Sequence, residues 1–163
     1  MGTLILGLGL MLTASAAGAE TKADDILGEW MTDKNESKIV VTKKEGKYYG
    51  KLTWLDEPNY PEDDEEGEAG VAKHDRLNPD KDLQSRPIIG LQLLSKFVFD
   101  KGDKTWEKGK IYDPESGKLY KCVIRLGEKG ELNVRGYIGL PALGRTTTWT
   151  RPKPKDEAET KAE

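Results

Sequence analysis

The feature that most constrains this chain is a series of short runs in which apolar and polar residues alternate. In residues 47–55, for example, Tyr48, Gly50, Leu52 and Trp54 fall on one face of an extended chain. Successive side chains of a strand point to opposite faces, so this period of two predicts strands. The predicted strands are residues 37–42, 47–55, 91–99, 106–112, 118–126, 131–138 and 145–151.

Turn-forming residues separate these runs. Residues 44–46 predict a hairpin turn that ends at Gly46. Residues 113–117 combine a proline and a glycine and predict a second turn. Residues 24–31 are expected to form one helical turn that leads into a first strand. About eight short strands without a long helix predict an all-β fold, either an antiparallel up-and-down barrel or a sandwich. Closure into a barrel would remove exposed strand edges.

The two ends of the chain depart from this pattern. Residues 4–12 are apolar, and Ala17-Gly18-Ala19 fits the small-x-small rule for cleavage. We therefore expect a signal peptide over residues 1–19, cleavage after Ala19, and a periplasmic or secreted protein without a membrane span after cleavage. Residues 152–163 mix Lys, Pro and Glu and are predicted to be a disordered tail, which leaves residues 20–151 as the domain.

Composition excludes several classes of site. The chain has 26 basic and 29 acidic residues and a net charge of -3, so no general basic field favours nucleic acid. Cys122 is the only cysteine, which rules out an intrachain disulfide and a Cys-rich zinc site. His74 is the only histidine, and no G-x-S-x-G motif accompanies it. We expect no catalytic residues, no cofactor and no metal.

Two polar segments interrupt the strand pattern. Residues 56–70 contain eight acids, two prolines and two glycines, which is typical of a long exposed loop. Residues 73–86 are basic and polar. Within them Asp75, Asn78, Asp80 and Asp82 offer oxygen atoms that calcium accepts, but the spacing is not that of an EF-hand loop. Asx-Pro turn chemistry accounts for these residues without a metal.

Several motifs occur together in an informative order: GKIYDPESGKLYK at 109–121, LNVRGYIG at 132–139 and LGRTTTWTR at 143–151. With GEW at 28–30, YGKLTW at 49–54 and RPIIGL at 86–91, they resemble the bacterial family called domain of unknown function 2147, over residues 24–151. The resemblance implies a secreted or periplasmic, lipocalin-like (calycin-like) barrel with no established activity or agreed catalytic residues. Many relatives have a cysteine pair before the segment matching residues 87–91, whereas this chain has His74, Asp75, Asn78 and Asp80 there.

One group of residues looks like the closed end of a lipocalin barrel. There a tryptophan near the N-terminus closes the barrel and a late cation stacks on it. Such a stack contributes about 0.5–2 kcal/mol. The pocket would then lie at the other end. The residues assigned to this structural role are Gly28, Trp30, Arg145, Trp149 and Arg151.

A second group is predicted to line a ligand cavity. Aromatic side chains on strands favour an apolar site, although a filled core is an equal alternative. Arg135 could meet an anionic head group, but alternation with Leu132 and Val134 favours an outward side chain. Cys122 is expected to be a buried, inert thiol. The candidate ligand-binding residues are Tyr48, Trp54, Arg86, Tyr112, Tyr120, Arg135 and Tyr137.

These observations leave three functional hypotheses. The first is a non-catalytic module that binds a small apolar or amphipathic ligand, with residues 56–70 and 73–86 flanking the mouth. The second is an envelope protein-interaction module with a filled barrel, which contacts a protein partner through its loops or residues 145–151. A cavity larger than about 300 Å³ would favour the first. The third and least supported is a hydrolase that uses His74, Asp75 or Asp113.

Overall fold

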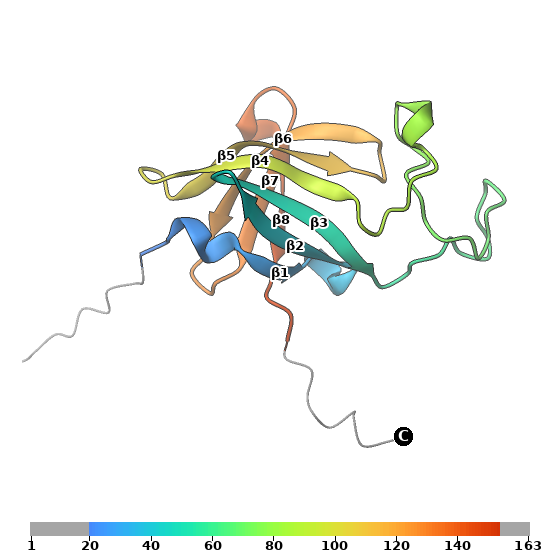
Figure 1. The fold of residues 1–163 in the computed structure, drawn as a ribbon, viewed down its shortest axis with the longest axis horizontal. Coiled ribbons are helices and arrows are strands. Elements are labelled where there is room, and N and C mark those ends of the chain that lie inside the picture. Colours follow the sequence, from blue (N-terminus) through green and yellow to red (C-terminus); the bar gives the residue numbers. More distant parts are fainter. Residues whose placement is uncertain (1–19, 154–163) are drawn as a thin grey trace, which may run out of the picture.

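The protein forms one eight-stranded antiparallel sheet that curls into a nearly closed barrel (Figure 1). The computed structural model describes residues 20–153, so the predicted signal peptide and most of the predicted tail lie outside the described residues. Each strand pairs with the next along the chain, which makes this an up-and-down barrel. The strands are β1 (Gly28–Met31), β2 (Ser37–Lys44), β3 (Lys47–Leu55), β4 (Gln92–Asp100), β5 (Thr105–Asp113), β6 (Lys118–Leu126), β7 (Leu132–Tyr137) and β8 (Arg145–Trp149).

The first and last strands meet and bring the sheet round on itself. The backbone N–H of Met31 donates to the carbonyl of Thr150 at 2.8 Å, and the N–H of Thr150 donates back to the carbonyl of Met31 at 2.9 Å. These bonds occupy groups that would otherwise lie along an open sheet edge. The choice between barrel and sandwich, which the sequence left open, is settled in favour of the barrel.

Helical structure among the described residues is limited to single 3₁₀ turns. The predicted helical turn before the first strand is η1 (Ala23–Ile26), and the others are η2 (Asp33–Asn35), η3 (Lys81–Leu83) and η4 (Pro141–Leu143). None of the helices within residues 20–153 has the length and apolar character needed to cross a membrane.

Side chains fill the barrel at the end that η1 covers. Trp30, Trp106 and Phe97 are almost completely buried there. The indole N–H of Trp30 donates to the carbonyl of Ile26 at 2.8 Å, and that of Trp106 donates to the carbonyl of Ala23 at 2.9 Å, which fixes η1 across this end. Phe97 lies over Gly109, where a Cβ would come within 2.4 Å of the ring. We call this the closed end.

Two predicted face assignments are wrong. The β2–β3 register shifts so that Ile39 pairs with Leu52 while the preceding Lys38 pairs with Trp54. The extra residue breaks the period of two, and the Trp54 side chain is 38% exposed, with Lys38 Nζ 5.7 Å from the ring centroid. Ile138 ends the predicted strand 131–138, where continued alternation would place it on the face of Leu132 and Val134, but it lies beyond the end of β7 and is exposed.

Candidate functional site: two cavities at the open end

The opposite end of the barrel, which we call the open end, holds two cavities. The first has a volume of about 430 Å³ and lies between the inner faces of β3 and β4 and the long loop of residues 56–91. Leu52, Leu55, Ile88 and Leu93 form its apolar part. Its charged and polar part comes mainly from the loops and includes Glu36, Asp64, Lys73, His74, Arg76 and Glu115.

The second cavity has a volume of about 360 Å³ and lies between β5, β6, β7 and β8. Its inner wall consists of Ile111, Tyr120, Val134, Gly136 and Thr147. Its rim carries six charged side chains, Asp33, Lys34, Glu36, Asp113, Glu115 and Arg145. Two of these, Glu36 and Glu115, also line the first cavity, so the two cavities are neighbours at one barrel end.

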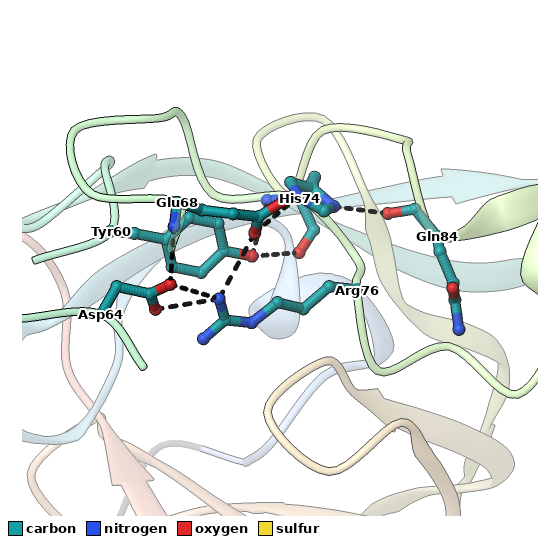
Figure 2. Close-up of polar contacts among 6 residues, drawn as sticks. All are labelled: Tyr60, Asp64, Glu68, His74, Arg76 and Gln84. Carbon is teal, nitrogen blue, oxygen red and sulfur yellow. Dashed lines mark hydrogen bonds and ion pairs between the residues drawn. The ribbon is translucent and has the colours of Figure 1, made fainter. Parts of the chain in front are cut away.

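The wall of the first cavity that comes from the long loop is held together by Arg76 (Figure 2). Its Nη1 donates to both carboxylate oxygens of Asp64, at 2.9 and 3.1 Å, and lies 3.4 Å from Glu68 Oε2. The guanidinium also lies over the ring of Tyr60, with Cζ 3.9 Å from the centroid. One guanidinium nitrogen shared by two carboxylates, together with the contact over the Tyr60 ring, fixes the position of Arg76, so this wall of the cavity is held by specific side-chain contacts.

His74 completes the same cluster (Figure 2). Its Nδ1 lies 2.6 Å from the carbonyl oxygen of Gln84, and its Nε2 lies 3.0 Å from both carboxylate oxygens of Glu68. A carbonyl and a carboxylate only accept, so both ring nitrogens donate and the imidazolium form is favoured. The Gln84 carbonyl and then Glu68 raise the pKa of His74, against burial and the charge of Arg76.

A second anchor fixes the loop to the barrel wall. The Asp75 carboxylate is fully buried and accepts hydrogen bonds from Tyr112 Oη at 2.6 Å, Asn78 Nδ2 at 2.7 Å and Arg86 Nε at 2.9 Å. Arg86 Nη2 lies 2.8 Å from the same carboxylate. Burial and then the hydrogen bond to Asp75 raise the pKa of Tyr112 to about 12, so its phenol keeps its proton and keeps donating.

The residues considered for a hydrolase or a calcium site are engaged in structural contacts. Asp75 is saturated by the donors just described, and Asp113 accepts from the N–H of Glu115 and the hydroxyl of Ser116 within the β5–β6 turn. Asn78 Oδ1 accepts from the N–H of Asp80, whose own carboxylate accepts from Asp82 N–H. These are Asx turns, the non-metal interpretation. Within residues 20–153 no cluster of three or more His, Cys, Asp or Glu residues is arranged to hold a metal.

Of the predicted ligand-binding residues, only Tyr120 lines a cavity. Tyr48 is buried at the closed end, where its hydroxyl donates to Asp24. Tyr112 and Arg86 belong to the Asp75 anchor, and Trp54 is turned outward by the β2–β3 bulge. Arg135 and Tyr137 alternate with the inward residues Val134 and Gly136 and do not line either cavity.

The predicted closure group is split between the two ends. Trp30 and Trp149 are buried, and Arg151 Cζ lies 3.6 Å from the Trp30 ring centroid at the closed end. Gly28 has a φ of +100°, and a Cβ there would come within 3.1 Å of Arg151. Arg145 begins β8 at the open end and lines the second cavity, so its assignment to closure is wrong. Strand β8 runs from the open end to the closed end, so Arg151, which follows its last residue, reaches Trp30, whereas Arg145, its first residue, does not.

Sequence reasoning missed most of the residues that line the cavities. Alternation along β3 could have found Leu52, and the apolar stretch after Pro87 contained Ile88. Glu36 and Glu115 lie in a turn before β2 and in the β5–β6 turn, where no periodic pattern marks a side chain as lining a cavity. Cys122 is buried as expected, and burial raises the pKa of its thiol to about 12.

Comparison with known proteins agrees with this architecture. A structure titled "Protein HP1028 from the human pathogen Helicobacter pylori belongs to the lipocalin family" is similar, with a TM-score of 0.63 and 24% sequence identity over 83% of this chain and 86% of that one. That likeness concerns the fold. The comparison with curated proteins gave no match. The model of a family described as uncharacterized protein conserved in bacteria, DUF2147, matches residues 28–151, and the chain therefore belongs to this family.

Proposed function

We propose that the protein is an exported, non-catalytic binding module that holds a small amphipathic ligand in the open half of its barrel. The single observation that carries the proposal is the pair of adjoining cavities, of about 430 and 360 Å³. Both exceed the volume of about 300 Å³ at which small-molecule sites begin. The alternative of an interaction module with a filled barrel is favoured less, because side chains fill only the closed half.

The lining chemistry supports an amphipathic ligand. Leu52, Ile88 and Leu93 supply apolar contacts in the first cavity, whereas Lys73 and Glu36 lie at its polar part. Ligand pockets typically combine mostly apolar walls with a few polar groups that fix orientation. A ligand with an apolar body and a polar end would satisfy both parts.

The non-catalytic part of the proposal rests on His74 and Asp75. Every polar side-chain atom of both residues has a hydrogen-bond partner within the protein, so both are accounted for by structural contacts. Export is supported by the apolar run and small-residue site before Glu20. Fractionation of the producing cell, with the mass of the mature protein, tests it: a chain that retains residues 1–19 in the cytoplasm would contradict it.

The ligand proposal is tested by native mass spectrometry of the protein purified from its own host. We expect an adduct of small-molecule mass that is lost on denaturation. Replacing Gly136 with leucine should abolish it, because a side chain there projects into the second cavity; the nearest atom to a built Cβ is Ile111 Cγ2 at 3.5 Å. Leu55→Trp fills the first cavity in the same way.

Gly136→Ala is the matched control, because a methyl group at this position makes only ordinary van der Waals contact. It should fold and keep the adduct. Two results together would contradict the proposal and favour a protein partner. The wild-type protein would show no adduct in native mass spectrometry, and its melting temperature would not change when lipid extracts of the host envelope are added.

A further inference from the structure

The loop between β7 and β8 displays an unusual set of exposed apolar side chains. Ile138, Leu140 and Leu143 are 66%, 67% and 82% exposed, and every residue of the segment 138–143 is exposed. We call this segment the apolar loop; it stands at the top of the view in Figure 1. Single exposed apolar residues are ordinary, but a contiguous group marks a surface that meets a partner or a membrane.

The apolar loop is held in shape by the barrel itself. The outward side chain of Arg135 donates from Nε to the carbonyl of Pro141 at 2.8 Å, from Nη2 to the carbonyl of Ala142 at 2.9 Å, and from Nη1 to Thr146 Oγ1 at 2.8 Å. One guanidinium therefore fixes both the 3₁₀ turn η4 and the start of β8. A loop fixed in this way presents its apolar side chains without a further ordering cost.

The strands beside the apolar loop are positively charged although the chain as a whole is acidic. Strands β6, β7 and β8 contain no acidic residue, whereas they contain Lys118, Lys121, Arg125, Arg135 and Arg145. On the outer face Lys121 pairs across the sheet with Lys110 on one side and with Tyr137 on the other, next to Ile138.

Neither Lys110 nor Lys121 forms an ion pair with another of the residues 20–153. Like charges directly opposite on neighbouring strands are unfavourable for the sheet, so the fold alone does not explain this pair. An anionic surface in contact with this face would relieve the repulsion.

We propose that the apolar loop and the outer face of β5–β7 dock the protein on an anionic lipid surface. The leucine and isoleucine side chains enter the boundary between head groups and acyl chains, and the lysines remain at the level of the anionic head groups. Apolar anchors combined with basic neighbours are the pair of signals that peripheral binding requires. This orientation sets the rim of the second cavity, where Arg145 lies, against the membrane. The docking does not depend on a ligand in the cavities.

Co-sedimentation with lipid vesicles tests the proposal, using the chain from residue 20 to 163, which includes every barrel and core contact described above. We expect binding to vesicles that mix phosphatidylcholine with phosphatidylglycerol and little binding to phosphatidylcholine alone. Leu140→Asp with Leu143→Asp should weaken binding by at least about tenfold. Lys110→Glu with Lys121→Glu should weaken it by at least about tenfold, and added salt should weaken wild-type binding.

Matched controls exist at other parts of the surface. Val71→Asp changes another exposed apolar residue, 49% exposed, in the long loop. Lys44→Glu with Lys47→Glu reverses another cross-strand lysine pair, at the β2–β3 hairpin of the closed end. Both should bind like the wild type. Gly136→Leu, which fills the second cavity, should also bind normally, and this separates docking from ligand binding.

Three results would overturn the proposal. One is equal binding to the two kinds of vesicle, or none to either. Another is unchanged binding by both the apolar-loop and the lysine variants. The last is a dimer that forms with increasing protein concentration in sedimentation equilibrium and that the double variant Leu140→Asp, Leu143→Asp converts to a monomer. The apolar loop would then be an interface between two copies of the chain.

Discussion

The guanidinium of Arg151 lies over the indole of Trp30, with Cζ 3.6 Å from the ring centroid. The same guanidinium donates to the carbonyls of Leu27, Glu29 and Asp25, at 2.9, 3.2 and 2.9 Å. Arg151, at the end of the domain, thus contacts η1, β1 and Trp30, the buried tryptophan at the closed end of the barrel. This contact fastens the two ends of the domain together at the closed end.

Replacing Arg151 with alanine should lower the free energy of unfolding by about 2 kcal/mol, through loss of the cation–π contact and its hydrogen bonds. Urea denaturation measures the change. Arg151→Lys should recover only part of it, because a lysine lacks the planar fork that reaches three carbonyls. Arg145→Ala, at the opposite end of β8, is the control and should change stability little. Equal effects at the two positions would contradict the assignment.

The Asp75 anchor predicts an ordered loop. Tyr112→Phe removes the hydroxyl that donates to Asp75 and accepts from Asn78, and should cost about 1–2 kcal/mol. Asp75→Ala leaves Arg86 without its counter-ion and should cost about 3 kcal/mol. Hydrogen exchange over residues 73–87 should accelerate in both variants. Tyr137→Phe, on an outer strand face, serves as the control; if it matched Tyr112→Phe, the anchor would not be the cause.

Two glycines of the barrel interior should differ in their tolerance of alanine. At Gly109 a Cβ would lie 2.4 Å from Phe97 ring atoms, whereas at Gly136 the nearest atom is 3.5 Å away. Gly109→Ala should therefore lower stability by about 1–3 kcal/mol or more through overpacking, and Gly136→Ala should be nearly neutral. Thermal unfolding of the two variants measures the difference. A neutral Gly109→Ala would mean that the closed half is less tightly filled than described.

His74 should make stability depend on pH. Its pKa is raised in the folded protein, so its contribution is fully present below about 6.5, the ordinary value, and is lost as the pH rises through the folded value. Because His74 is the only histidine, one imidazole resonance in an NMR titration reports the folded pKa. His74→Gln should remove this part of the pH dependence of thermal unfolding. A folded pKa at or below the ordinary value would contradict the double-donor geometry.

Several features were accessible from the sequence because they depend on neighbouring residues. Alternation predicted β3 and β6 with their observed bounds, and Gly46 and Gly117 have the positive φ that their turns require. Trp54 shows where this reasoning fails. Its face depends on a β2–β3 register shift, which arises from pairing between strands and leaves no mark in the period of either one.

The sequence by itself determined the all-β class and a count of about eight strands, because local periodicity and turn chemistry indicate them directly, whereas the role of Trp30 at the closed end came from its likeness to the lipocalin arrangement. Only the tertiary structure decided the contents of the open end. Residues separated by long stretches of chain meet there, such as Tyr60 with Arg76, Asp75 with Tyr112, and Glu36 with Glu115 at the junction of both cavities. Loop residues have no period to predict their direction, so barrel closure and the anchors of the long loop determine which of them face a cavity.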